Sequence, residues 1–357
     1  MVCKVAVVGT VGLPACYGGF ESLVDNLIKH NDKDIEYTVF CSSKYYKNKI
    51  NSYMGAKLIY LPINANGVSS IFYDMLSLAK CIVGKFDVIL ILGVSGCIFL
   101  PLFRLMSDAL IITNIDGMEW RRQKWGKIAR KFLKLSESVA VKYSDIVVSD
   151  NQVIVDYVKE EYGVESKNIS YGGDHALCNH IDKEVLVEGD YYISICRIEP
   201  ENNVHLILEA FSKSEQKIKF IGNWNANDYG IQLKRKYSKY SNIDIIDPVY
   251  DLDILYSFRC SCKGYVHGHS AGGTNPSLVE AMHFGKTVIA FDCGFNRHTT
   301  GNEALYFNNA ESLFNVINNE NAPSNGEKMI AIAQKSYTWD IISKQYKHLF
   351  TMSKNKK

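Results

Sequence analysis

Short apolar runs alternate with segments of helical periodicity along most of the chain, and this alternation constrains the fold more than any other feature. The expected strands of the first half span residues 4–8, 36–40, 57–61, 88–92, 109–114 and 146–148. After about Gly173 the alternation restarts, with strands expected at 191–196, 218–221, 243–245, 264–267 and 287–291, and helices at 204–211, 278–284 and 312–318. Such alternation predicts parallel sheets that helices cover on both faces. We therefore expect an α/β protein with two Rossmann-like, doubly wound domains facing a cleft, with ligands outside the carboxyl ends of the strands.

Composition and charge narrow the class of protein. With 357 residues the chain is long enough for two domains, and a formal net charge of +2 argues against a general nucleic-acid binder. The ten cysteines include no C-x-x-C pair, which argues against a zinc ribbon and favours free thiols in a reducing cytosol. The first residues form a buried strand that is too short for a secretion signal, so we expect a cytoplasmic protein.

The apolar run 88–106 raises the question of a membrane span. Its interruptions are Gly93, Gly96, Pro101 and Arg104. A strand, a glycine turn and a buried helix explain the run better than a span does.

The segment His267-Gly-His-Ser-Ala-Gly-Gly-Thr-Asn-Pro-Ser-Leu-Val-Glu280-Ala-Met282 predicts the mouth of a helix. Glycines precede a proline that suits the first helical position, and Glu280 follows one turn later. The N–H groups and positive dipole end of such a helix attract phosphate, while the carboxylate can accept hydrogen bonds from a ribose. This combination indicates a nucleotide-diphosphate site, although an ordinary loop that enters a buried helix would show the same local pattern.

The first strand leads into a glycine-rich loop, Gly9-Thr-Val-Gly12-Leu-Pro14-Ala-Cys-Tyr-Gly18-Gly19-Phe-Glu21. The spacing does not match G-x-G-x-x-G, so the dinucleotide fingerprint is absent. Gly18 and Gly19 stand immediately before an amphipathic helix, where missing side chains let the backbone approach a diphosphate. A tight strand-to-helix turn that needs positive φ is the alternative.

Arg197 follows the first strand of the second half. At the carboxyl end of a buried parallel strand, a guanidinium can clamp phosphate in a bidentate manner. Surface pairing with Glu199 or Glu201 is the alternative.

Asp116 and Glu119 follow the strand expected at 109–114. Carboxylates in this position can orient a hydroxyl or act as a base, and the alternative is a helix cap with Glu119 in the first turn. From Trp120 to Lys134, basic and aromatic residues interleave. That pattern suits an anionic membrane surface or a phosphate-bearing acceptor, and an ordinary solvated helix face is the alternative.

His267 and His269 end a strand and are expected to face the cleft. A metal would need a third ligand that no spacing supplies, so no metal site is predicted. These histidines could donate hydrogen bonds to a sugar or phosphate. The alternative is that they are core histidines.

Taken together, these segments resemble a GT-B glycosyltransferase of the retaining family 4. More narrowly, they resemble the bacterial rhamnosyltransferase branch with a DUF1972-type N-terminal domain, which serves capsule, O-antigen and cell-wall polysaccharide assembly. The resemblance runs nearly end to end, and it rests on residues 12–21, 116–120, 171–174, 268–282, 295–297 and 337–339. The glycine loop and the segment from Thr274 to Met282 are its specific parts.

The resemblance implies a role for each matching residue. Gly18 and Gly19 would approach the donor diphosphate from one side, and Arg197 would clamp it from the other. Glu280 would hold the ribose, and Asp116 would lie near the acceptor or the anomeric carbon. Asp116, Arg197 and Glu280 are thus the catalytic candidates. Further candidates are His267, His269, Gly273, Thr274, Asn275 and Ser277 for the donor, and Glu119 and Trp120 for the acceptor.

The resemblance also implies an acceptor-side domain at residues 1–175, a donor-binding domain at 176–337, and a last helix at 338–357 that crosses back onto the first domain. The chain departs from the broad family at two positions. The first of two glutamates separated by seven residues falls at Gly272, and a common lysine falls at Asn202. The Asn202→Lys change is therefore expected to be neutral or even helpful.

We interpret the chain as a retaining glycosyltransferase that moves L-rhamnose from dTDP-L-rhamnose to a lipid-linked glycan acceptor in bacterial surface polysaccharide synthesis. It would work without metal or cofactor, because Arg197 and helix-end N–H groups can stabilise the diphosphate. Its expected location is the cytoplasm, with peripheral contact to the inner face of an anionic membrane and no nucleic-acid partner. The alternatives are a UDP-hexose-dependent enzyme of the same fold and a non-catalytic nucleotide-sugar-binding protein, the latter favoured by Gly272 and Asn202. A nicotinamide oxidoreductase is a further rival, which the missing glycine fingerprint opposes.

Overall fold

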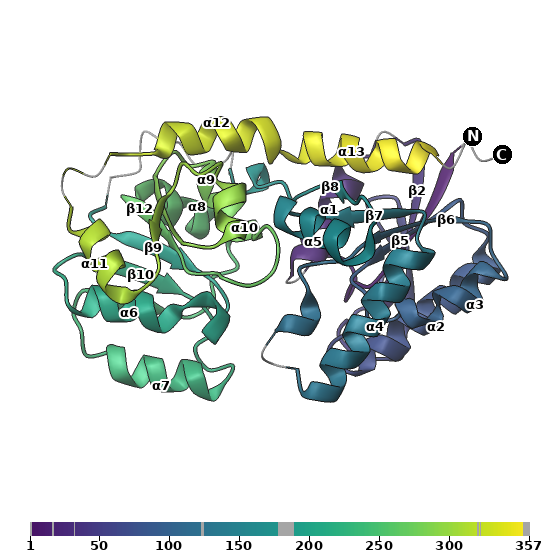
Figure 1. The fold of residues 1–357 in the computed structure, drawn as a ribbon, viewed down its shortest axis with the longest axis horizontal. Coiled ribbons are helices and arrows are strands. Elements are labelled where there is room, and N and C mark those ends of the chain that lie inside the picture. Colours follow the sequence, from purple (N-terminus) through teal and green to yellow (C-terminus); the bar gives the residue numbers. More distant parts are fainter. Residues whose placement is uncertain are drawn as a thin grey trace. The chain divides into compact units, whose positions relative to one another are not determined.

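A computed structural model of the protein describes residues 2–15, 18–31, 33–122, 125–177, 189–319, 321 and 323–352. The chain forms two compact units, Met1–Tyr171 with Trp339–Lys357, and Gly172–Thr338. Each unit contains one sheet with helices packed against it (Figure 1). The units divide four residues before the expected boundary at 175/176, so that residues 172–175 pack with the second unit.

The first unit contains a sheet with the strand order β3-β4-β2-β1-β5-β6-β7-β8. Its strands are β1 (Cys3–Val8), β2 (Ile35–Ser42), β3 (Ser52–Tyr53), β4 (Ala56–Leu61), β5 (Val88–Leu92), β6 (Leu110–Asn114), β7 (Ile146–Ser149) and β8 (Lys167–Asn168). Neighbouring strands pair in parallel, except that β3 pairs antiparallel with β4. Strand β5 is wholly buried, which explains why its sequence is an unbroken apolar run rather than an alternating one.

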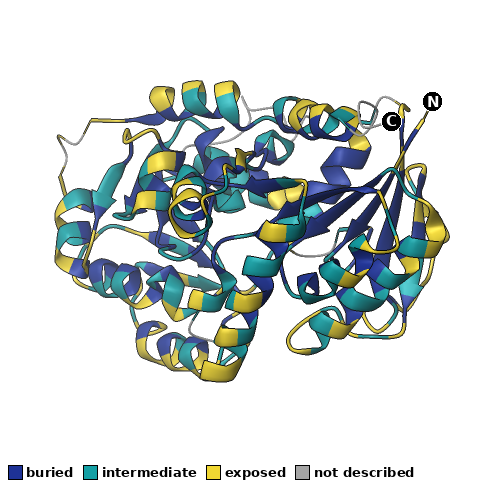
Figure 2. Ribbon diagram, turned by 45° about the vertical axis from the view of Figure 1, so that its right-hand side comes forward, coloured by how far each residue is buried: buried dark blue, intermediate teal, exposed yellow. Residues whose placement is uncertain are grey.

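Helices pack on this sheet in two groups. Helix α1 (Gly19–Lys29) contacts α13 (Trp339–Thr351), whereas α2 (Ser69–Gly84) and α4 (Lys127–Tyr143) both contact α3 (Leu100–Arg104). Helix α5 (Gln152–Tyr162) joins the second group, because the Tyr157 hydroxyl donates to Glu137 Oε1 of α4 at 2.5 Å. The outer faces of these helices are exposed, and the strands beneath them are buried (Figure 2).

The expected return of the last helix to the first unit is confirmed. In α13, the Tyr346 hydroxyl accepts a hydrogen bond from Asn114 Nδ2 at 3.1 Å, at the carboxyl end of β6. The Phe350 ring packs edge-on against Tyr37 of β2, with ring centroids 6.2 Å apart. Helix α13 thus packs on the first unit with buried aromatic side chains.

The run 88–106 forms a strand, a turn and a helix, as expected: β5 is followed by the 3-10 turn η1 (Cys97–Phe99) and then by α3. The expectation of a buried helix is wrong in part. Leu100 and Phe103 of α3 are buried, but Leu102 is exposed because the short helix turns one side outward. Among the described residues, no helix has the length and apolar character needed to cross a membrane.

The second unit contains a parallel sheet with the strand order β11-β10-β9-β12-β13-β14. Its strands are β9 (Tyr192–Ile195), β10 (Ile218–Ile221), β11 (Ile243–Ile246), β12 (Gly264–His267), β13 (Thr287–Phe291) and β14 (Leu305–Phe307). Its helices are α6 (Val204–Ser212), α7 (Asp228–Tyr237), α8 (Leu252–Ser261), α9 (Pro276–Met282), α10 (Gly294–Thr299), α11 (Ala310–Ile317) and α12 (Gly326–Ser336). Helix α6 contacts α7 and α11, and α9 contacts α12. One buried cluster centred on Phe211, Phe220 and Trp224 forms the core between α6 and the sheet.

The predicted α/β architecture is therefore confirmed in both units. In the second unit, β9 and β12 are neighbours in the sheet although about 70 residues separate them in sequence. The loops that follow these two strands consequently leave the same edge of the sheet. The eight described cysteines are free thiols, and Cys16 and Cys178 lie outside the described residues.

Candidate functional site

The glycine loop of the first unit is fixed by the buried carboxylate of Glu21 in the first turn of α1. Glu21 Oε1 accepts the backbone N–H of Val11 at 2.8 Å, and burial raises the pKa of this carboxyl even though that hydrogen bond lowers it. Gly18 has a φ of 127°, and a Cβ at this position would collide with Glu21 Oε2. Gly18 therefore serves a tight turn in which only glycine fits. Its predicted approach to a diphosphate stays a prediction.

Asp116 lies in the loop that follows β6, with its side chain partly exposed. Its φ is 58°, an uncommon left-handed conformation for a residue with a side chain, and its N–H donates to Asn114 Oδ1 at 3.1 Å. The next element is the 3-10 turn η2 (Glu119–Arg121), whose N-cap is Met118 and which has no side-chain cap. The alternative of a helix cap by Asp116 is therefore wrong. Such strained conformations persist where the surroundings enforce them, and they cluster at functional sites.

Tyr171, the last residue of the first unit before the chain enters the second, is buried and is influenced by three carboxylates. Burial raises the pKa of Tyr171, and the negative charges of Asp150, Asp116 and Glu21 raise it further. Strands β1 and β6 both pair in parallel with β5, so the segments that follow them leave the sheet at the same edge. The first unit thus places Asp116 and the glycine loop at the same edge of the sheet.

Glu119 and Trp120, the acceptor-side candidates, have partners within their own segment. Glu119 Oε1 accepts from the Trp125 indole at 2.9 Å, and Glu119 Oε2 pairs with the Arg122 guanidinium at 2.8 Å. The carboxylate therefore links Trp125 and Arg122 to the start of η2. The Trp120 ring carries Arg121 at 5.0 Å and Lys134 at 4.9 Å from its centroid, in cation–π geometry.

The basic stretch divides into paired and exposed cations. Lys134 hydrogen-bonds the Tyr157 hydroxyl and lies 2.9 Å from Glu161 Oε1. Arg121, Lys127 and Lys131 are exposed. Lys124 lies outside the described residues. The stretch is thus partly a packed cluster and partly a basic surface.

In the second unit, Arg197 stands directly after β9, as predicted. Its side chain is 41% exposed, and its Nη1 lies 3.8 Å from Glu199 Oε1. That distance is too long for a bidentate hydrogen-bonded pair. Pairing with Glu199 is therefore loose, and the guanidinium remains accessible to an anion.

Asn202 connects the loops after β9 and β12. Its Nδ2 donates to the Arg197 carbonyl at 2.6 Å, and its Oδ1 lies 2.6 Å from His269 Nδ1. The residue is buried, and a Cβ on Gly268 would collide with its carbonyl oxygen. Asn202 is thus a structural link between two strand ends.

These contacts lead to a different expectation for Asn202→Lys, namely a loss of stability rather than a neutral or helpful effect. The lysine would lose both hydrogen bonds and would place a charge in a buried position without a carboxylate partner. We expect the variant to lose about 2–3 kcal/mol of unfolding free energy, as measured by urea denaturation. The matched control is Gln232→Lys, which introduces a lysine at an exposed position of α7. A folded Asn202→Lys protein as stable as Gln232→Lys would contradict the expected loss.

His267 is buried at the end of β12, where its ring stacks on Tyr265 at 5.9 Å. Burial lowers the pKa of His267 to about 3, so the imidazole is neutral at physiological pH. Its Nε2 has no hydrogen-bond partner among the described residues. The neutral imidazole can therefore form a hydrogen bond with a nucleotide-sugar donor, but it provides no positive charge.

Helix α9 begins as expected, with Asn275 as N-cap and Pro276 at the first position. Asn275 Oδ1 accepts the N–H of Ser277 at 3.0 Å, so the chain itself satisfies part of this helix end. Ser277 Oγ also lies 3.2 Å from the carbonyl of Ile195, at the end of β9. Gly273 and Thr274 are buried in the preceding turn. Gly272, at the position of the absent glutamate, has a φ of 90°, which a glutamate would adopt only with strain.

Glu280 in α9 has a partner for each of its two carboxylate oxygens. Its Oε2 pairs with the Arg259 guanidinium of α8, and its Oε1 lies 3.2 Å from His175 Nε2. Burial opposes the charged form, but Arg259 and His175 outweigh it, and the pKa of Glu280 lies below its ordinary value. The carboxylate is therefore ionised, while 16% of the side chain stays exposed. A fixed, ionised and partly open carboxylate can accept hydrogen bonds from vicinal hydroxyls.

Sequence reasoning missed the contacts that Glu280 makes with Arg259 and His175. No local spacing links either residue to Glu280, which lies 21 positions after Arg259. The glycine before Asp174 gives a partial signal: a Cβ on Gly173 would collide with the backbone of Val279 and Glu280. Gly173 thus lets the segment carrying His175 lie directly on α9.

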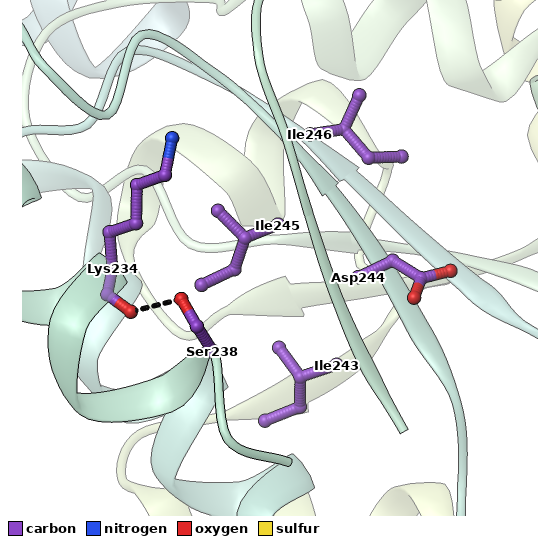
Figure 3. Close-up of a pocket in the computed structure, with 6 residues that line it drawn as sticks. All are labelled: Lys234, Ser238, Ile243, Asp244, Ile245 and Ile246. Carbon is purple, nitrogen blue, oxygen red and sulfur yellow. Dashed lines mark hydrogen bonds between the residues drawn. The ribbon is translucent and has the colours of Figure 1, made fainter. Parts of the chain in front are cut away.

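A hollow in this unit lies apart from Glu280 and its partners. It has a volume of about 390 Å³ beside the edge strand β11, and it is lined by Lys234, Ser238 and residues 243–246 (Figure 3). The charged ends of Lys234 and Asp244 lie on opposite sides of it (Figure 3). The predicted site residues do not line this hollow. Among the described residues, no group of three or more His, Cys, Asp and Glu side chains is arranged to hold a metal ion.

Comparisons with known proteins agree with this geometry. Residues 2–174 match the family described as Domain of unknown function (DUF1972), and residues 179–320 match the family described as Glycosyl transferases group 1. The fold resembles sucrose-phosphate synthase from Thermosynechococcus elongatus, with a TM-score of 0.79 and 14% identity over 99% of this chain and 100% of the other. The two family matches and the fold define the protein as a glycosyltransferase with the GT-B fold.

Two further solved structures are similar over their full length. A glycosyltransferase from Rickettsia africae ESF-5 has a TM-score of 0.72 and 13% identity, with 100% of each chain covered. Anabaena HepE in complex with UDP-glucose also has a TM-score of 0.72 and 13% identity, over 98% of this chain and 99% of the other. At such identities the likeness concerns the fold alone. No curated protein matches the sequence.

Proposed function

We propose that the protein transfers L-rhamnose from dTDP-L-rhamnose to a lipid-linked glycan acceptor, with retention of configuration, during bacterial surface polysaccharide synthesis. The observation that carries the proposal is the ionised Glu280, which Arg259 and His175 hold in place within the segment matching Glycosyl transferases group 1. A carboxylate fixed in this way suits the two hydroxyls of a sugar ring in the nucleotide. A deoxyribose in dTDP has one fewer hydroxyl than the ribose of UDP, and one carboxylate oxygen suffices to accept from it.

In this proposal the diphosphate lies at Arg197, on the strand next to the one that leads to α9. The bond between the anomeric carbon and the diphosphate oxygen breaks, and negative charge grows on that oxygen. The accessible guanidinium of Arg197 stabilises the charge more in the transition state than in the ground state. The leaving oxygen then takes the proton of the acceptor hydroxyl as the new glycosidic bond forms on the same face of the sugar. Asp116 orients this hydroxyl, and no metal ion or cofactor takes part.

The choice of rhamnose rests on the sequence resemblance of the glycine loop and of residues 268–282, together with the DUF1972 match over residues 2–174. UDP-glucose is the competing donor, since the similarly folded HepE was solved with it. Gly272 favours a donor other than that of the broad family, because the position has no side chain to contact the sugar.

A ligand that binds only the native state raises the melting temperature, so thermal unfolding can rank donors. We expect dTDP-L-rhamnose to raise the Tm more than UDP-glucose at equal concentration, and Glu280→Gln to reduce the shift. Release of dTDP in the presence of lipid-linked acceptor would complete the assignment. A larger rise in Tm with UDP-glucose would make UDP-glucose the assigned donor. If the donor binds but no acceptor leads to release of nucleoside diphosphate, the protein is a non-catalytic nucleotide-sugar-binding protein.

We also propose peripheral contact with an anionic membrane, through the basic stretch that follows Trp120. Arg122 pairs with Glu119. The residues that would contact the lipid are therefore Arg121, Lys127 and Lys131, which are exposed. Each basic residue near anionic lipid contributes about 1 kcal/mol, so changing these three to Gln should weaken vesicle binding by roughly a hundredfold at low salt.

The matched control replaces three exposed lysines of the same unit, Lys44, Lys47 and Lys49, with Gln. Binding to vesicles containing phosphatidylglycerol is measured by sedimentation at low and high salt, because salt screens the attraction. Equal loss in both triple variants would mean that net charge alone, rather than the stretch after Trp120, governs binding.

A further inference from the structure

An apolar pocket of about 620 Å³ opens between the N-terminal ends of α2 and α4 in the first unit, two helices that lie side by side in Figure 1. Its volume is typical of pockets that hold small organic ligands. The larger side chains of its lining are Val68, Ile71, Trp125, Ile128, Phe132 and Leu133. Lys127 is the charged residue among the lining residues. The pocket is thus an apolar chamber with one cation at its wall.

The rim of the pocket is apolar as well. Val68, at the start of α2, is 63% exposed, and Phe72 lies one turn further along the same helix and is also exposed. Ile128, in the first turn of α4, is 87% exposed. Large apolar side chains that gather around a hollow and face solvent commonly mark a binding surface.

Charge is distributed unequally around this mouth. Among the described cations of residues 120–135, Arg121, Lys127 and Lys131 are exposed, whereas residues 62–73 contain no charged residue. Lys127 and Lys131 lie one turn apart on α4, and both are exposed. Helix α4 begins here with Gly126 as N-cap and without a side-chain cap, so the positive end of its dipole adds to the cations. The mouth is therefore positive while the interior is apolar.

We propose that this pocket holds the hydrocarbon chain of the lipid-linked acceptor, with the first phosphate of that lipid at Lys127, Lys131 and the first turn of α4. This inference rests on the proposed function, since it names the part of the acceptor that the first unit recognises. It goes beyond general attraction to an anionic surface, because residues 67–71 belong to the site although they carry no charge. The chain enters between Val68 and Ile128 and ends against Leu133.

The distribution of charge argues against a second copy of the protein as the occupant. In a two-fold symmetric contact, the same patch meets itself, so that Lys127 and Lys131 of one copy would face those of the other. Like charges at such a contact are repulsive. An anionic lipid, in contrast, neutralises the mouth and fills the chamber.

Trp125, in the pocket wall, provides a reporter for occupancy. Bromine quenches tryptophan fluorescence at contact distance, so 9,10-dibromostearate serves as a single-chain anionic probe and unbrominated stearate as its control. We expect saturable quenching in the wild type below the critical micelle concentration of the probe. We expect most of that quenching to disappear in Trp125→Phe, because the other three tryptophans lie outside the pocket.

Two variants test the pocket itself. Ala129→Phe fills the chamber from α4 and should weaken probe binding at least tenfold. Val68→Asp leaves the packing intact, since Val68 is mostly exposed, and adds a negative charge at the mouth that should weaken binding by a similar factor. The matched control is Val83→Phe, which enlarges an exposed apolar residue at the far end of α2. Far-ultraviolet circular dichroism checks that each variant is folded.

Quenching that is lost in Ala129→Phe and Val68→Asp but kept in Val83→Phe supports the proposal. Equal quenching in all variants, or dimers in sedimentation experiments that Val68→Asp dissociates, would overturn it. The donor-induced rise in Tm separates this inference from the proposed function. If dTDP-L-rhamnose gives no rise while the probe still quenches Trp125, the donor assignment fails and the pocket stands. If the donor stabilises the protein while the probe does not quench, the pocket fails and the donor assignment stands.

Discussion

Replacing Arg197 with Ala is expected to lower kcat by roughly a hundredfold or more while leaving the fold intact. The loss follows from the proposed role of the guanidinium, because a preorganised charge removed from a developing anion typically costs about 3–4 kcal/mol of transition-state stabilisation. The fold should survive, since the side chain is 41% exposed and has only a loose contact with Glu199. Steady-state release of nucleoside diphosphate measures the rate, and thermal unfolding measures the stability.

The conservative and control variants sharpen this test. Arg197→Lys should recover only part of the rate, because an ammonium is a point charge and cannot form the bidentate fork. Arg235→Ala removes another exposed arginine, near the end of α7 in the same unit, and should leave the rate unchanged. Near wild-type turnover in folded Arg197→Ala would show that the diphosphate lies elsewhere, and the assignments built around it would have to be withdrawn.

The architecture was predictable because buried parallel strands have a strong local signature. Strand β5 is covered on both faces, so its five residues are all apolar and its limits match the expected 88–92. The edge strands β3 and β8 have two residues each, and neither carries a pattern that distinguishes a strand from a turn. The antiparallel pairing of β3 with β4 was missed for the same reason.

The sequence predicted where the site residues lie in the fold better than it predicted which side chains contact them. Arg197, His267 and Asn275 could be placed because each stands at a strand end or a helix start that the local sequence marks. Asn202 was interpreted as a missing lysine, although its real role depends on His269, a residue far away in sequence. Glu119 was expected to face the acceptor, but the structure shows both of its oxygens occupied within the loop. Partners of this kind are determined by packing between elements, which no local spacing encodes.

The absent glutamate has a physical explanation that sequence alone could not give. With a φ of 90°, Gly272 lies in the left-handed region that favours glycine. A glutamate would need another loop conformation before its side chain could reach a sugar. The departure from the family pattern is therefore a property of the whole loop before α9, rather than the loss of one side chain.

The pair formed by Arg259 and Glu280 leads to the second large expected effect, which concerns stability. The side chains are 6% and 16% exposed, so removing one partner leaves a nearly buried charge without compensation. Arg259→Met should therefore lower the unfolding free energy at pH 7 by about 3 kcal/mol. It should also weaken the donor-induced rise in Tm, because Glu280 would lose the partner that orients it.

The pH dependence of this loss has a definite sign. The pKa of Glu280 in the folded protein lies below its ordinary value of 4.5, so the pair contributes stability above that pH and loses it as the pH falls through the lowered pKa. In Arg259→Met, burial still raises the pKa of the Glu280 carboxyl, but the charge that lowered it is gone. The loss of unfolding free energy relative to wild type is therefore largest at neutral pH, where the carboxylate is ionised. The difference from wild type in urea unfolding should shrink as the pH falls below about 4.5.

A double variant separates the structural role of the pair from its role in binding. Arg259→Met with Glu280→Met replaces both charges by apolar groups of similar size, which is often neutral for stability. The double variant should thus recover much of the stability that Arg259→Met loses, yet it should show no donor-induced rise in Tm, because the carboxylate that accepts from the sugar hydroxyl is absent. If the double variant instead loses as much stability as Arg259→Met and Glu280→Met do together, the two residues are not coupled. A donor-induced rise retained in the double variant would instead place the sugar hydroxyls away from Glu280, whatever the pair does for the fold.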